Sequence, residues 1–417
     1  MAAADEVTSM QRCRFCGTDL RHLVVDLGMS PLCESFLRAD QLDAMEPFYP
    51  LRVFVCDSCF LVQLQDYVGP EAIFTEYAYF SSFSSSWLQH ASDYVGAITE
   101  RLRLGAGNLV VELASNDGYL LQYFVERGIP VLGIEPARNV AAEATRRGVP
   151  TLVEFFGQEL ARRLRAEGRA ADLVIGNNVL AQVPDLNGFV AGMRTLLAPR
   201  GTITLEFPHI VRLIEENQFD TIYHEHFSYF SLATVERIFA AHGLTVFDVD
   251  QLATHGGSLR VYGRHGEDSS RPVSARVQAL RQDEATRGYD RIETYLRFDD
   301  RVRATKRALL GFLIEAKVAG RSIAGYGAPG KGNTLLNYCG IRTDFLDFTV
   351  DRNPYKHGRF LPGTHIPIFP PERIAETRPD DILILPWNLR HEIAAQLDYA
   401  RAWDVRLVVP IPELGVL

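Results

Sequence analysis

Two cysteine pairs near the N-terminus have the spacing of metal ligands. Cys13 and Cys16 form one C-x-x-C pair, and Cys56 and Cys59 form a second. Each pair can place two thiolates on one turn, and two facing turns make the four-sulfur tetrahedron that Zn²⁺ favours. A redox pair would instead open a helix in a thioredoxin-like unit, a context that neither pair has. The cysteines therefore predict a structural zinc site.

Small, acidic and amide residues follow three apolar runs in the middle of the chain. The carboxyl ends of parallel strands share one edge of a sheet, where open α/β sheets bind ligands. A single acid at a strand end is usually solvated, but several in register favour a site. The first loop lacks the G-x-G-x-x-G that cradles a pyrophosphate. The candidate cofactor contacts are Glu112, Ala114, Asn116, Gly118, Glu135, Pro136, Asn177 and Asn178.

Two of these residues have a specific expected role. Glu135 would lie at the tip of the second strand, where its carboxylate can accept hydrogen bonds from both ribose hydroxyls of a nucleoside. Gly118 has no side chain, so we expect it to let the backbone approach the ligand closely.

A segment rich in histidine and tyrosine follows at residues 221–230. If Tyr223 to His226 is extended, Tyr223 and Glu225 point one way, and His224 and His226 point the other. A tight turn would bring more of them to one site. Two histidines around a glutamate could also bind a metal, but H-E-H lacks the helical H-E-x-x-H spacing. Acid–base chemistry is the favoured role.

A glycine-rich loop at residues 325–334 follows a strand and precedes a predicted helix, so its amides could cradle a diphosphate. Asp351 closes the next strand, as a ribose-binding acid would. One interpretation is a nicotinamide-binding dehydrogenase domain. The other is a domain for the nucleotide of a substrate. Its phosphates would then lie near Lys331, Asn333, Lys356 and His357.

Two series of alternating strands and helices must position these residues. The first has predicted strands at 109–113, 131–135, 171–176 and 201–206, and ends in a hairpin across Gly256 and Gly257. The second has predicted strands at 322–326, 345–351, 381–385 and 405–410. Alternation of this kind predicts parallel sheets covered by helices. We expect a zinc module at 1–70, an α/β domain at 71–266 and a second α/β domain at 267–417.

Composition narrows the function. The 417 residues carry a formal charge of -9 and are 47% hydrophobic, which predicts two or three globular domains and disfavours nucleic acid as a partner. The N-terminus lacks an export signal and no apolar run is long enough to span a membrane, so we expect a cytoplasmic protein.

The central loop, Glu-Leu-Ala-Ser-Asn-Asp-Gly-Tyr-Leu-Leu, and the acids around it resemble class I methyltransferases, specifically the C-methyltransferases of nucleotide-linked keto sugars. That family begins with a four-cysteine zinc module, has a Y-H-E-H-F-S-Y pattern and ends with a second Rossmann-like domain, so the resemblance covers nearly the whole chain. It implies a class I Rossmann-like fold, S-adenosylmethionine as cofactor and structural Zn²⁺.

The resemblance also implies a reaction. The substrate would be a dTDP-linked 4-keto deoxysugar, methylated at C-3' in the biosynthesis of an antibiotic. The sequence leaves the oligomeric state open, with a monomer as one expectation. His226 would be the base for an enolate, with Glu225 as its partner or an alternative base. Tyr223 and His224 would contact the substrate. The tyrosines Tyr77 and Tyr79, with Phe80, would reach over the donor. Methylation of O or N and a non-enzymatic nucleotide-binding module remain alternatives.

Overall fold

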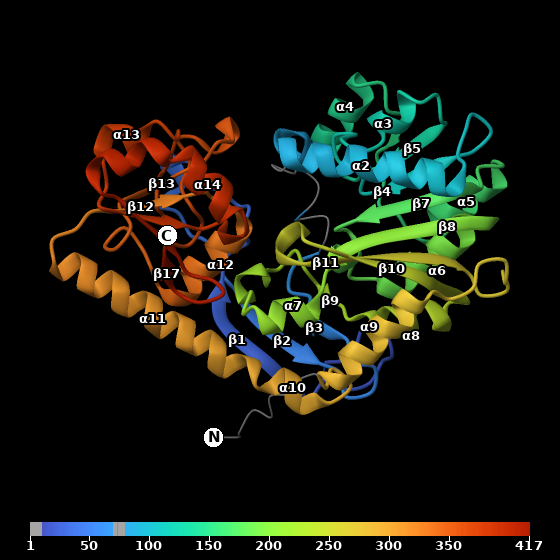
Figure 1. Ribbon diagram of the computed structural model, residues 1–417, viewed down its shortest axis with the longest axis horizontal. Coiled ribbons are helices and arrows are strands. Elements are labelled where there is room, and N and C mark those ends of the chain that lie inside the picture. The colour runs from blue at the N-terminus through green and yellow to red at the C-terminus, as the bar shows by residue number, and fades with distance from the viewer. Residues whose placement is uncertain (1–10, 70–72, 74–79) are drawn as a thin grey trace, which may run out of the picture.

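The computed structural model describes residues 11–69, 73 and 80–417, which form three β-sheets with covering helices. Figure 1 shows two lobes side by side, one built from the middle of the chain and one from its C-terminal part, with the N-terminal sheet beneath them. Within the described residues no helix has the length and apolarity that crossing a membrane requires.

The N-terminal sheet is completed by a strand from the middle of the chain. Its antiparallel order is β1-β2-β3-β9. The strands are β1 (His22–Ser30), β2 (Tyr49–Val55), β3 (Val62–Leu64) and β9 (Ser228–Tyr229). Because β9 begins two residues after His226, the predicted catalytic segment is anchored to the cysteine-bearing module.

The central sheet has seven strands in the order β10-β11-β8-β7-β4-β5-β6. Five are parallel, and the predicted hairpin forms the antiparallel edge, β10 with β11. The strands are β4 (Val110–Leu113), β5 (Val131–Ile134), β6 (Thr151–Leu152), β7 (Ala171–Asn177), β8 (Leu197–Pro208), β10 (Leu244–Leu252) and β11 (Ser258–His265). The main helices are α2 (Ser85–Leu102), α3 (Gln122–Val125), α4 (Arg138–Arg146), α5 (Gln158–Ala166), α6 (Leu186–Leu196), α7 (Ile210–Glu215) and α8 (Leu232–Ala241).

The C-terminal sheet has six strands in the order β14-β13-β12-β15-β16-β17, and only the last pair is antiparallel. The predicted second α/β series is therefore confirmed. Its strands are β12 (Ile323–Tyr326), β13 (Phe348–Val350), β14 (Ile368–Phe369), β15 (Asp381–Ile384), β16 (Arg406–Val409) and β17 (Gly415–Val416). Its helices are α12 (Gly330–Cys339), α13 (Arg373–Thr377) and α14 (Arg390–Gln396).

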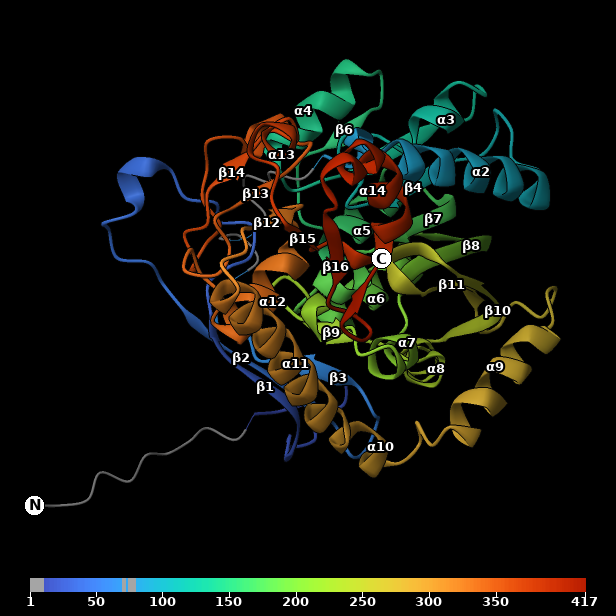
Figure 2. The same cartoon turned by 60° about the vertical axis from the view of Figure 1, so that its left-hand side comes forward.

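Three helices connect the lobes: α9 (Ala275–Thr286), α10 (Ile292–Leu296) and α11 (Phe298–Val318). Val277 and Leu280 of α9 belong to the core of the central lobe. Leu309 and Leu313 of α11 share a core with the N-terminal and C-terminal sheets. Figure 2 shows α11 running along β1. The hydrophobic cores therefore include residues from both sides of the predicted boundary at residue 266. The domain boundaries stay predictions.

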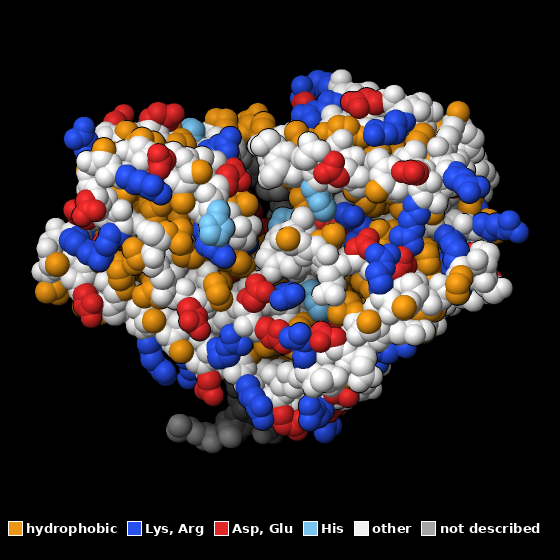
Figure 3. Space-filling model, in the orientation of Figure 1, with side chains coloured by type: hydrophobic (Ala, Val, Ile, Leu, Met, Phe, Trp, Pro, Cys, Tyr) orange, Lys and Arg blue, Asp and Glu red, His pale blue; other side chains and the backbone are white. Residues whose placement is uncertain are grey.

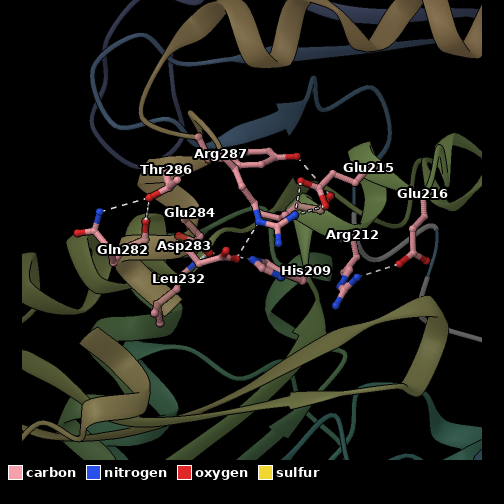
Figure 4. Close-up of polar contacts among 12 residues, drawn as sticks. His209, Arg212, Glu215, Glu216, Leu232, Gln282, Asp283, Glu284, Thr286 and Arg287 are labelled. Atoms are coloured by element: carbon pink, nitrogen blue, oxygen red, sulfur yellow. Dashed lines mark hydrogen bonds and ion pairs between the residues drawn. The ribbon is translucent and has the colours of Figure 1, made fainter. Parts of the chain in front are cut away.

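A buried carboxylate ties α9 to the central lobe. Glu284 accepts hydrogen bonds from the backbone amides of Leu232 (2.7 Å) and Ala233 (3.0 Å) and from His209 Nε2 (2.8 Å). The first amides of a helix have no partner within it, so this carboxylate satisfies the start of α8. Figure 4 shows Glu284 between His209 and Leu232. The contact holds His209 at the end of β8.

We expect Glu284→Ala to lower the free energy of unfolding by about 3 to 5 kcal/mol, because it leaves His209 and two helix amides buried without their acceptor. The matched control is the neighbouring Asp283→Ala, which removes only an exposed ion pair with Arg287 and should cost under about 1 kcal/mol. Urea titration measures both, and equal losses would contradict the assignment.

Candidate active site

The four predicted metal ligands come together. Their Sγ atoms all lie within 4.8 Å of one another, with Cys13 to Cys59 and Cys16 to Cys56 both at 3.5 Å. Zn–S bonds of about 2.3 Å in a tetrahedron place sulfurs roughly 3.8 Å apart, so the cluster fits Zn²⁺. Gln63 Nε2 donates to Cys13 Sγ (3.2 Å), which connects the cluster to β3.

Glu135 fixes the loop that follows β4. One carboxylate oxygen accepts from the amide of Asn116 (2.9 Å) and the other from the amide of Ala137 (2.8 Å). Ala114 and Asn116 both have positive φ (54° and 49°), a strained conformation that these contacts hold. Burial raises the pKa of Glu135 to about 7. The acid therefore lies at the strand tip, as predicted for a ribose contact.

Buried polar atoms line the same rim. Within the described chain the amide nitrogen and oxygen of Asn177 are buried without hydrogen-bond partners. Native proteins rarely leave such atoms unpaired, so their position fits a polar ligand such as S-adenosylmethionine. Glu112 is also buried, and this burial, with Glu135 and Asp117 nearby, raises its pKa well above the ordinary value. Asn178 bonds instead to His255 (Nδ2 to Nε2, 3.2 Å).

Gly118 occupies a turn of the loop that follows β4. Its φ is +76°, and a Cβ there would lie 3.0 Å from Val149 Cγ2 and 3.3 Å from Ala144 Cβ. The glycine is needed for the turn and for packing against α4 and the residues after it, and its part in ligand approach stays a prediction. Close packing also explains Gly133 in β5, where a Cβ would collide with Ser115 Oγ.

The segment before α2 lies across the donor loop. The amide of Ser81 donates to Asn116 Oδ1 (3.0 Å). The ring of Phe80 stacks on Tyr355 of the C-terminal lobe, with centroids 5.8 Å apart. Phe80 therefore bridges the lobes beside the predicted cofactor site. The candidates Tyr77 and Tyr79 lie outside the described residues.

Tyr223 to His226 form a β-turn, so the extended alternative is wrong. The amide of His226 donates to the Tyr223 carbonyl (2.9 Å), and the two rings lie on the same side with centroids 4.1 Å apart. His226 Nδ1 donates to the Thr221 carbonyl (3.0 Å), which leaves Nε2 as the proton acceptor. Burial lowers the pKa of His226 to about 4, and burial raises that of Tyr223 well above its ordinary value. A neutral imidazole and a protonated phenol therefore lie together.

The other two residues of the turn face the N-terminal module. Cys33 Sγ donates to Glu225 (3.4 Å), a contact that no sequence motif indicated. His224 Nε2 donates to the Pro50 carbonyl (3.2 Å), and its ring packs edge-on against Tyr49. The side chain of His224 therefore supports the turn from the N-terminal sheet through Nε2, and its contact with the substrate stays a prediction.

Figure 3 shows a groove between the two lobes. Lys331, in the first turn of α12, lies close enough to the central lobe for its charge to act on Asp220. Its Nζ donates to Asn388 (2.9 Å) and lies 4.7 Å from the centre of the Trp387 ring. Burial lowers the pKa of Lys331, and the carboxylate of Asp220 opposes that shift. Its charge also acts on His226, so it reaches the catalytic turn electrostatically.

Asp351 repeats the arrangement of Glu135. It accepts from the amide of Ala328 in the glycine-rich loop (2.7 Å) and from the amide of Asn353 (2.8 Å). Glu135 makes the same two kinds of contact, one to the first loop and one to the amide two residues on. Both lobes therefore hold an acid against the loop after their first strand.

The remaining phosphate candidates make hydrogen bonds within the protein, and their role in phosphate binding stays a prediction. Lys356 donates to the Ala328 carbonyl (2.8 Å) and pairs with Glu34 of the N-terminal module (3.6 Å). His357 donates to the Asp351 carbonyl (2.7 Å), and Asn333 donates to the carbonyl of Cys33.

Three family models match consecutive parts of the chain: a zinc binding domain at 13–74, a methyltransferase domain at 87–249 and a C-methyltransferase C-terminal domain at 253–412. C-methyltransferase NovU of Streptomyces niveus is 38% identical over 415 residues, 99% of this chain and 98% of that protein. The chain belongs to the C-methyltransferase family. For this C-methyltransferase the predicted fold class, enzyme class and cofactors, S-adenosylmethionine and Zn²⁺, are confirmed.

Two solved structures with similar folds each cover less than half of this chain. Magnesium protoporphyrin IX methyltransferase from Synechocystis PCC 6803, with bound SAM, is 15% identical with a TM-score of 0.33, covering 42% of this chain and 78% of that one. PH0226 protein from Pyrococcus horikoshii is 16% identical with a TM-score of 0.37, covering 48% and 99%.

Removal of zinc should disable the C-methyltransferase. We expect Cys56→Ser to lower the zinc content from about one ion per chain to near zero and to abolish methyl transfer, because the cluster anchors β3 and therefore the catalytic turn. Elemental analysis and a methyl-transfer assay measure the two effects. The control is Cys339→Ala, a buried cysteine outside the cluster, which should keep the metal. A zinc-free variant with full activity would contradict this.

Binding of S-adenosylmethionine should weaken as the pH falls through about 7. Protonation of Glu135, whose pKa is raised to about 7, removes the ionised carboxylate that accepts from the ribose, so affinity should drop about tenfold between pH 8 and pH 6. Calorimetry measures the affinity. Glu135→Gln should bind weakly with no such slope, and an unchanged slope in this variant would refute the assignment.

Proposed function

We propose that this C-methyltransferase methylates the carbon next to the ketone of a dTDP-linked 4-keto deoxysugar, at C-3', within the biosynthesis of an antibiotic sugar. The observation that carries the proposal is the turn at His226, which presents an unprotonated Nε2 in a buried site beside the donor lobe. A carbon acid must lose its proton before it can attack an electrophilic methyl group, and His226 is the base for that step.

A backbone carbonyl and the charge that forms on the substrate support His226 as the base. The Thr221 carbonyl fixes the tautomer of His226 and accepts from Nδ1–H before and after proton transfer. The proton removed from C-3' moves to Nε2, and the electron pair moves onto the ketone oxygen as an enolate. Burial disfavours the imidazolium alone, but this cation forms next to the enolate anion, so the two charges stabilise each other.

The enolate carbon is then the nucleophile. Bound S-adenosylmethionine supplies a methyl group on a positively charged sulfur, and S-adenosylhomocysteine is the leaving group. The chain's own part is to hold the reactants in line and exclude water. Tyr223 keeps its hydroxyl protonated and lies against the base, where it can donate to the sugar.

The nucleotide of the substrate belongs to the C-terminal lobe in this proposal. Asp351 is held as Glu135 is, which favours a nucleoside contact, and Lys331 lies close enough to His226 for its charge to act on the imidazole. Membership of the C-methyltransferase family replaces the dehydrogenase interpretation of this lobe. A cytoplasmic location and a monomeric enzyme stay predictions.

Hydrogen exchange tests the proposed chemistry. In heavy water without the methyl donor, we expect the wild type to exchange the C-3' proton of dTDP-4-keto-6-deoxyglucose, because enolisation precedes methyl transfer. His226→Asn should slow this exchange at least about 100-fold, since it removes the base. Nuclear magnetic resonance of the sugar protons measures the rate at each carbon.

The matched control is His224→Asn in the same turn, which faces the N-terminal sheet and should retain exchange. Exchange at C-5' alone would correct the ring carbon. A wild type that neither exchanges nor yields a C-methyl product would overturn the proposal and favour O- or N-methylation.

A further inference from the structure

His255 occupies a costly conformation next to the site. It sits between β10 and β11 with φ 54° and ψ 22°, the left-handed region, although the two residues that follow it are glycines. A side chain in this region is strained, and glycine would avoid that strain. A strained side chain is a candidate for a functional role, which its contacts must decide.

One aromatic ring and one amide hold the imidazole in place. The ring of Trp87 from α2 meets it edge-on, with centroids 5.0 Å apart. Asn178, directly after β7 at the donor rim, donates from Nδ2 to His255 Nε2 (3.2 Å). The imidazole proton is therefore on Nδ1, which has no hydrogen-bond partner within the described chain.

The backbone of the loop is clamped between the lobes. The carbonyl of Gly256 accepts from Gln218 Nε2 (2.7 Å), and a Cβ at Gly256 would lie 2.7 Å from the Trp387 ring of the C-terminal lobe. Thr254 donates to Glu206 Oε1 (2.9 Å), a buried carboxylate that also pairs with His90. The strained loop is thus fixed on both sides.

These contacts place His255 between the donor rim at Asn178 and the proposed base, His226. Its ring touches Asn178 on the donor side, and its electrostatic neighbours include Lys331 and His226. From this geometry we propose that His255 is a second catalytic histidine, whose Nδ1–H donates a hydrogen bond to the ketone oxygen of the substrate as the enolate forms. The assignment rests on the proposed function and adds the donor that the enolate needs.

The protonation state suits this role. Burial lowers the pKa of His255 to about 4, so the imidazole is neutral and can polarise a carbonyl without giving up its proton. Neutral histidine is a known electrophile toward carbonyl oxygens in other enzymes. An oriented donor of this kind stabilises the enolate more than the ketone, which accelerates enolisation.

The test is His255→Gly, which removes the ring and also relieves the backbone, so the variant should fold. We expect exchange of the C-3' proton of dTDP-4-keto-6-deoxyglucose in heavy water, without methyl donor, to fall about 100- to 1000-fold. The kcat for methylation should fall with it, while the KM for the sugar nucleotide and the affinity for S-adenosylmethionine stay close to wild type. Added imidazole should restore part of the exchange.

The matched control is Asp404→Gly, which relieves the same conformation (φ 60°) at an exposed helix end and should leave the exchange rate unchanged. Unchanged exchange in His255→Gly overturns this inference alone. Loss of S-adenosylmethionine affinity in parallel with exchange also overturns it, because His255 would then serve the donor loop. A wild type without exchange overturns the proposed function, and this inference falls with it.

Discussion

The pairing of β3 with β9 is the contact on which the catalytic arrangement depends. Val62 pairs with Tyr229 and Gln63 with Ser228, and the amide of Leu64 donates to the Phe227 carbonyl (3.0 Å). Since Gln63 also donates to Cys13 Sγ, the thiolate cluster, the N-terminal sheet and the turn at His226 form one continuous unit. The zinc module therefore does more than stabilise a terminus, because it sets where the base points.

Much of the fold follows from local sequence. The apolar runs that alternate with helical segments predicted both parallel sheets, and the Gly256–Gly257 pair predicted the antiparallel edge. The strand-end acid Glu135 and the four cysteines were also found, because strand ends and ligand spacing are local properties. The structure brings the four cysteines together and places Glu135 at the tip of its strand, as expected.

Contacts between distant segments could not be predicted in the same way. Whether Tyr223 to His226 are extended or turned is decided by one backbone hydrogen bond and by packing against Tyr49 and Pro50. Lys356 has the residue type of a phosphate ligand, but Glu34 from the N-terminal module pairs with it. No sequence pattern indicated a role for His255, apart from the two glycines that follow it. Each of these outcomes depends on tertiary contacts that override residue type.

The β3–β9 pairing also has a consequence for folding. Its two strands come from distant parts of the chain, and contacts of long sequence separation form slowly because a large loop must close first. The donor loop, by contrast, is assembled from neighbouring strands and helices. We therefore expect a newly made chain to form the place for the methyl donor before its base is oriented, so that cofactor binding precedes catalytic competence during folding.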